Sequence, residues 1–160
     1  MEIICKNESL QVLYYNVASP KLPDLDKDYI NDPFEIIKAC HNHVLKYGSA
    51  IDNNHKTLIK REQAAVVENY IVNEDSYATP NGLKAIAGFV TKAEAEAIKE
   101  LFPHLINKSL NVADSNWKIV PANSWYMGVK FFDKELFEKA KKNSAVSMFG
   151  FADREDIEVD

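Results

Sequence analysis

The apolar segment Trp125-Tyr-Met-Gly-Val-Lys-Phe-Phe132 decides the fold predicted for this chain. Its aromatic and β-branched residues favour a β-strand, and Asp133 can cap the short helix predicted directly after it. A second strand is then predicted at residues 145–152, with Ser147 near its centre. A hydroxyl among apolar side chains is either hydrogen-bonded by its neighbours or placed on one surface of the sheet, where it can react.

Other segments of the chain predict further strands and helices. Residues 2–5 and 10–17 predict a hairpin, and Ala64–Val72 has the clearest strand pattern. Pro33 favours the start of a helix that Gly48 ends. The remaining predicted elements are strands at 84–90 and 117–120 and a helix at 93–101, while the apolar residues Phe34, Ile37, Cys40 and Val44 are expected to face a sheet from the helix at 33–47. Strands and helices do not alternate regularly, so the predicted fold class is α+β with a mainly antiparallel or mixed sheet.

The composition is typical of one globular domain. The chain has 160 residues, 46% of them hydrophobic and 27% charged, and its net charge is −5. Nucleic-acid binding usually needs clustered Lys and Arg, and a membrane span needs about 18 consecutive apolar residues; neither pattern occurs. Two cysteines are too few for a disulfide framework. We therefore expect a reduced, cytosolic domain at residues 1–160 with an acidic tail at 153–160, no cofactor, no nucleic-acid partner and no membrane association.

A histidine and a carboxylate upstream of Ser147 complete the residue types of a serine protease, in an order unlike that of trypsin or subtilisin. His55 lies in a polar turn that begins at Asp52, and a histidine can accept and return a proton near neutral pH. Glu68 lies inside an apolar strand, where a buried carboxylate needs a partner, and orienting His55 would supply one. A solvent-facing position or a salt bridge with Lys130 is the alternative for Glu68. Asp52 is the substitute third member, or it caps the turn.

Other polar residues have simpler explanations. Ser144 is a rival nucleophile, but its position at the helix exit favours a hydrogen bond to a carbonyl there. The alternative for Ser147 itself is a serine that hydrogen-bonds to a nearby backbone group and is not a nucleophile. Cys40 and His43 are spaced for one helix face, yet a structural zinc site needs four ligands, so no metal site is expected. The other histidines, His41 and His104, are interpreted, like His43, as structural or surface residues.

Three blocks of the chain resemble one protein family. They are Leu10–Val44, the turn at His55 followed by Val66-Val-Glu-Asn-Tyr-Ile71, and a closing block from Ser124 to Phe151. In this order they resemble the XkdF-type branch of phage prohead (capsid-maturation) serine proteases. The resemblance implies a fold like that of herpesvirus assemblins, a small, mostly antiparallel β-barrel flanked by helices.

The resemblance also implies a function. A member of this family acts as a serine endopeptidase on scaffold or major capsid precursor proteins during phage head assembly, in the bacterial host cytoplasm and inside the procapsid. The family nucleophile corresponds to Ser147, its histidine to His55, and Glu68 is the expected third member. Herpesvirus assemblins act as dimers, so a homodimer is a further expectation by analogy.

The chain departs from the family pattern in two places. Asn143-Ser-Ala-Val146 replaces the usual glycine-rich segment before the serine strand. The sequence therefore does not identify which backbone groups would bind the oxyanion. Residues 84–120 resemble an insertion. Two alternatives to an active protease follow: a catalytically inactive protease-fold component of a phage particle, and a helper domain that binds capsid precursor through the insertion.

Overall fold

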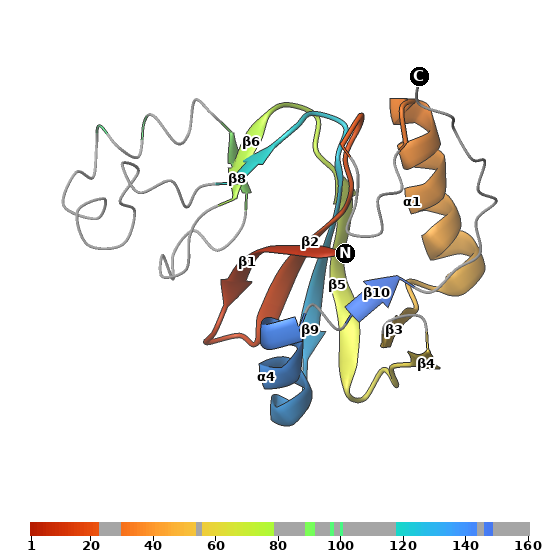
Figure 1. Cartoon of the computed structure of the whole chain (residues 1–160), viewed down its shortest axis with the longest axis vertical. Helices are drawn as coiled ribbons and strands as arrows, with labels where there is room; N and C mark the ends of the chain where they lie inside the picture. Colours follow the sequence, from red (N-terminus) through yellow and green to blue (C-terminus); the bar gives the residue numbers. More distant parts are fainter. Residues whose placement is uncertain are drawn as a thin grey trace, which may run out of the picture.

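The computed structural model describes residues 1–22, 30–53, 56–78, 89–91, 97, 100, 118–143 and 146–148. Within these residues a four-stranded sheet has the order β1-β2-β9-β5, with every neighbouring pair antiparallel. Figure 1 shows this main sheet at the centre of the molecule. Its strands are β1 (Glu2–Asn7), β2 (Val12–Ala18), β5 (Ala64–Ile71) and β9 (Trp125–Phe131).

Two smaller antiparallel sheets and two helices complete the described part of the fold. One small sheet has the order β10-β3-β4 and the other the order β7-β6-β8. These elements are α1 (Pro33–Tyr47), β3 (Ile51–Asn53), β4 (Thr57–Leu58), β6 (Ser76–Ala78), β7 (Phe89–Thr91), β8 (Lys118–Val120), α4 (Lys134–Asn143) and β10 (Val146–Met148).

The predicted α+β class and its mostly antiparallel sheets are confirmed, but the closed barrel is not. In the described part of the chain, β1 and β5 form the two edges of the main sheet, and no hydrogen-bonded ladder connects these edges. A barrel requires such a connection, because closure leaves no free edge. The same described residues contain no helix that is long and apolar enough to cross a membrane.

The central strand β9 explains where the core lies. Successive side chains of a strand point to opposite faces, and alternate residues of β9 from Trp125 to Phe131 pack into one large apolar cluster. Both helices, β3 and β10 contribute to this cluster, through Ile36, Cys40, Ile51, Phe137, Ala140 and Val146. We call it the main core. The opposite face of the sheet holds a smaller cluster of Cys5, Val12, Tyr14, Val72 and Tyr126, which we call the second cluster.

The helix α1 begins and ends as predicted but buries a different face. The Asp32 side chain accepts a hydrogen bond from the backbone N–H of Phe34 at 2.9 Å, and Gly48 ends the helix in a left-handed conformation with φ 57°. The buried residues are Ile36, Cys40 and His43. Two of the residues expected at the sheet, Phe34 and Val44, are 70% and 46% exposed. Two rows of residues on the helix could face the sheet. The row that packs is Ile36, Cys40 and His43, spaced by four and three residues.

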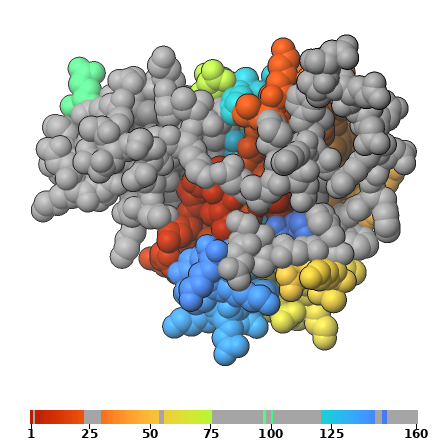
Figure 2. Space-filling model, in the orientation of Figure 1, coloured from red at the N-terminus to blue at the C-terminus, as the bar shows by residue number. Residues whose placement is uncertain are grey.

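The helix α4 also begins as predicted, at the end of β9. Asp133 Oδ1 accepts hydrogen bonds from the backbone N–H groups of Glu135 at 2.9 Å and Leu136 at 3.0 Å. At the other end of the helix, the Lys141 ammonium lies 3.0 Å from Glu8 Oε2. This ion pair joins α4 to the hairpin of β1 and β2, beside which α4 lies in Figure 2.

Several strands differ in extent from the predictions. The hairpin of β1 and β2 and the strands β5, β8 and β9 are confirmed. The segment around His55, predicted as a polar turn, contains β3 and the start of β4, and β6 lies where the sequence patterns predict no strand. Of the strand predicted at 145–152, residues 146–148 form β10 and the rest lies outside the described residues. The same is true of the acidic tail, most of the insertion, and the helix at 93–101 apart from residues 97 and 100.

Candidate active site

Ser147 and Asp52 face each other on paired strands. In the antiparallel ladder of β10 and β3, Ser147 is directly opposite Asp52. The Ser147 hydroxyl donates a hydrogen bond to Asp52 Oδ1. The adjacent residues Val146 and Ile51 point into the main core, so the serine and the aspartate share the other face of this small sheet.

Both members of this pair are buried. Asp52 is 3% exposed and Ser147 is 5% exposed. A carboxylate in such a position is costly to the folded state unless it is hydrogen-bonded, and the Ser147 hydroxyl supplies a charge-assisted hydrogen bond. Because both side chains are almost fully buried, their hydrogen bond belongs to the folded interior and is not a contact between two surface side chains.

The predicted base, His55, and its neighbour at position 54 lie outside the described residues, but Asn53 and Lys56 are described. Asn53 is paired with Val146 of β10 on one side and with Thr57 of β4 on the other. The backbone N–H of Lys56 donates to the carbonyl oxygen of Asn53 at 3.0 Å. Strands β3 and β4 therefore form a hairpin whose connection contains residue 55, and this hairpin begins at the strand that bears Asp52.

Glu68 lies on a different surface. It is opposite Gly128 in the ladder of β5 and β9, and Gly128 alternates with core-facing Met127 and Val129. The Tyr14 hydroxyl, which belongs to the second cluster, donates to Glu68 Oε1 at 3.3 Å. The structure thus brings Asp52 to Ser147, while Glu68 lies on the face of the main sheet that points away from β3 and β10.

A β-bulge accounts for the direction of Glu68. The register of β5 against β9 shifts between Val66 and Glu68, so Val67 is an extra residue without a directly opposite partner. Val66 packs against the main core. In a regular strand Glu68 would share the face of Val66, but the extra residue turns it to the other face and turns Asn69 toward the main core.

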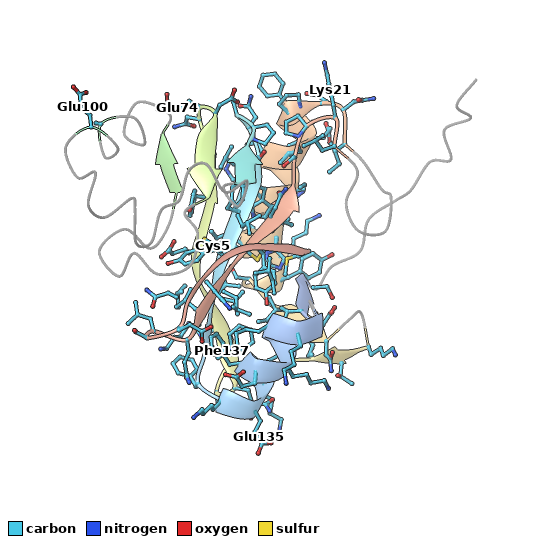
Figure 3. The ribbon with its side chains drawn as sticks, turned by 60° about the vertical axis from the view of Figure 1, so that its left-hand side comes forward. Cys5, Lys21, Glu74, Glu100, Glu135 and Phe137 are labelled. Carbon is cyan, nitrogen blue, oxygen red and sulfur yellow. The ribbon has the colours of Figure 1, made fainter. Side chains whose placement is uncertain are left out.

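The charge of Glu68 affects the pKa values of residues in the second cluster. Burial raises the pKa of the Cys5 thiol to about 12, and the nearby Glu68 carboxylate adds to this effect. Burial, followed by the charge of Glu68, likewise raises the pKa of Tyr14 to about 12. A thiol with such a pKa remains protonated at neutral pH and is a poor nucleophile. Cys5, labelled on the hairpin of β1 and β2 in Figure 3, is therefore a structural residue of this face.

Replacing Gly128 with alanine is expected to destabilise the fold by about 1–3 kcal/mol, as overpacking usually does. An added Cβ would lie 3.1 Å from Glu68 Cβ and 3.2 Å from Tyr14 Cε1, so two cross-strand neighbours would have to move. The free energy of unfolding in urea measures the effect. Activity per folded molecule should not change, because Gly128 faces away from Ser147. A loss below about 0.5 kcal/mol would contradict this account of the contact.

Of the other candidate residues, His41 is exposed and His43 is buried on α1. Ser144 and His104 lie outside the described residues. The sequence gives Asp52 only as a substitute third member, whereas the structure pairs it directly with Ser147. Its signal was present, because it is an aspartate three residues before a candidate histidine, but the polar segment around it did not indicate a strand.

A comparison with known protein families gives a match over nearly the whole chain. No curated protein and no solved structure showed significant similarity to this chain. The family model described as "Putative phage serine protease XkdF" matches residues 1–156. The matched region includes Ser147, Asp52, His55 and Glu68. The chain therefore belongs to the XkdF family of phage serine proteases.

Proposed function

We propose that this protein is a serine endopeptidase with Ser147 as nucleophile, His55 as general base and Asp52 as the residue that orients His55. The observation that supports it most directly is the hydrogen bond from the Ser147 hydroxyl to the buried Asp52 carboxylate. Membership of a family of phage serine proteases supports the reaction class. Asp52 takes the role that the sequence suggested for Glu68, because Glu68 bonds to Tyr14 on the other face of the main sheet.

Chain connectivity to Asn53 supports His55 as the proposed base. Consecutive Cα atoms are about 3.8 Å apart, and two residues of extended chain span at most about 7 Å. His55 is two residues from Asn53, and Asn53 is paired with Val146, the neighbour of Ser147. Directly opposite residues in an antiparallel ladder have Cα atoms about 4.5–5.5 Å apart. These limits keep the Cα atom of residue 55 within about 7 Å of that of Asn53, which is compatible with a general base that acts on Ser147.

The proposed reaction follows from these positions. When a peptide enters, the Ser147 hydroxyl turns from Asp52 to His55, gives its proton to the imidazole and bonds to the peptide carbonyl carbon. The Asp52 carboxylate stabilises the resulting imidazolium. His55 then gives the proton to the leaving amine as the C–N bond breaks, and a water molecule activated by the same imidazole hydrolyses the acyl-enzyme. No cofactor takes part in this sequence.

The proposed substrates are scaffold or major capsid precursor proteins of a phage, cleaved during head assembly inside the procapsid in the host cytoplasm. The phage origin of the family supports this assignment. The main competing function is a catalytically inactive protease-fold component of the particle. The two differ in one measurable property, which is the reactivity of the Ser147 hydroxyl.

A fluorophosphonate probe tests that reactivity, because it reacts with an activated serine and not with an ordinary hydroxyl. We expect one label per chain, located on Ser147 by mass spectrometry of the proteolytic fragments. Ser144 lies only three residues away and serves as an internal control in the same fragment. A folded protein that takes up no label, or that is labelled on Ser144, would overturn the proposed nucleophile and favour the inactive component.

A further inference from the structure

We infer that His43 is a positioning residue for the proposed site, which fixes the strand that bears Asp52 against α1 and the main sheet. Its catalytic consequence rests on the proposed function; its structural consequence does not. Sequence patterns suggested only a structural or surface histidine on a helix. The contacts of its ring give it a more specific role.

The first contact joins His43 to the start of β3. The imidazole is 3% exposed, and its Nε2 lies 2.7 Å from the carbonyl oxygen of Ala50. Ala50 directly precedes Ile51, the first residue of β3. A carbonyl oxygen can only accept, so Nε2 carries the proton and donates it. Burial lowers the pKa of His43 and so favours the neutral ring, although the hydrogen bond to Ala50 opposes this shift.

The second contact joins the same ring to the main sheet. The ring centroids of His43 and Trp125 are 5.6 Å apart, with the planes tilted by 58°. The Trp125 indole N–H donates to Asn69 Oδ1 at 2.5 Å, which fixes the indole between β9 and β5. The imidazole is therefore supported on one side by the main sheet and holds the backbone of β3 on the other.

Asp52 depends on this support because β3 is short. The strand has three residues, and Ile51 is its residue in the main core. A misplacement of about 1 Å in a catalytic group can lower a rate by about 10²-fold. Without the hydrogen bond from His43, the carbonyl of half-buried Ala50 would lose this donor, and we expect the start of β3 to shift as a result. The displacement would reach Asp52, two residues further along the chain.

Three variants separate positioning from general stability. His43→Leu removes the donor, and His43→Gln keeps an N–H donor on a side chain of similar reach. Ile36→Val weakens the main core from the same helix but leaves the hydrogen bond from His43 to Ala50 in place. We expect the rate of Ser147 labelling by fluorophosphonate to fall about 10–100-fold in His43→Leu. For turnover of a peptide substrate, the loss should appear in kcat, with KM changed less than about threefold. His43→Gln and Ile36→Val should both label within about threefold of the natural protein.

Amide hydrogen exchange supplies a readout that does not require activity. The N–H of Ile59 donates to the carbonyl oxygen of Ile51 at 3.0 Å and reports on the β3–β4 hairpin. We expect its exchange to be at least about tenfold faster in His43→Leu and unchanged in His43→Gln. Unchanged exchange in folded His43→Leu would overturn the inference even if the natural protein is inactive. Faster exchange with an unchanged labelling rate would overturn the catalytic part, as would equal rate losses in His43→Leu and Ile36→Val. If the natural protein takes up no label but exchange is faster in His43→Leu, the proposed function is excluded and the structural role of His43 remains.

Discussion

Replacing Ser147 with alanine is expected to lower the rate of peptide cleavage by about 10⁴–10⁶-fold, which is the usual cost of removing the nucleophile of a serine protease. Ser147 is the residue directly opposite Asp52 in the β10–β3 ladder, so we expect no other hydroxyl to replace it. The measurement is processing of the scaffold and major capsid precursors of the same phage, co-expressed with the natural protein or the variant and followed by gel electrophoresis. Processing by the variant at the natural rate would exclude Ser147 as nucleophile.

The Ser147 variant should remain folded. It removes one hydrogen-bond donor from Asp52, which costs about 1–3 kcal/mol, and domains of this size usually have about 5–15 kcal/mol of stability. Ser124→Ala is a matched control, because the Ser124 hydroxyl is also buried and donates to Ser19 Oγ at 2.8 Å. We expect a similar loss of stability in Ser124→Ala but normal cleavage. A comparable loss of cleavage in both variants would mean that stability, and not nucleophilicity, explains the effect.

The sequence predicted those elements of the fold whose local patterns agree with their packing. The strand β9 is buried on both faces, and its apolar run is rich in the aromatic and β-branched residues that favour a strand. The limits of α1 follow from Asp32, Pro33 and Gly48, which act through local backbone geometry. The packed face of α1 could not be read in the same way, because two apolar rows compete and only the position of the sheet selects one of them.

The candidate site was predicted in part for similar reasons. Ser147 is a candidate because a hydroxyl interrupts an apolar strand, and the resemblance to the phage proteases makes His55 the corresponding histidine. The bulge at Val67 has no sequence signal of its own, and simple alternation would place Glu68 on the face of Val66, whereas the structure turns it to the other face. The sequence indicates Asp52 only as a substitute third member, since a three-residue strand of mixed polarity depends on its partners β10 and β4 and not on its own pattern.

The two carboxylates can be distinguished by one pair of isosteric substitutions. Asp52→Asn keeps the shape of the side chain and its ability to accept a hydrogen bond from Ser147, but removes the negative charge. A neutral amide cannot stabilise an imidazolium and favours the wrong histidine tautomer, so we expect kcat to fall by about 10³–10⁴-fold. Glu68→Gln removes the same charge from the other face of the main sheet and should leave kcat within about threefold.

The measurement for both variants is the processing rate of the co-expressed precursors, with the free energy of unfolding as a check on folding. Glu68→Gln should also have a measurable local effect on the pKa values of its neighbours. The charge of Glu68 helps to raise the pKa values of Cys5 and Tyr14, so both values should fall when the charge is removed. If Glu68→Gln abolishes processing while Asp52→Asn retains it, Glu68 is the third member. Asp52 would then be only a hydrogen-bond partner of Ser147. The active site would also need groups from both faces of the main sheet, which the strand order β1-β2-β9-β5 keeps apart.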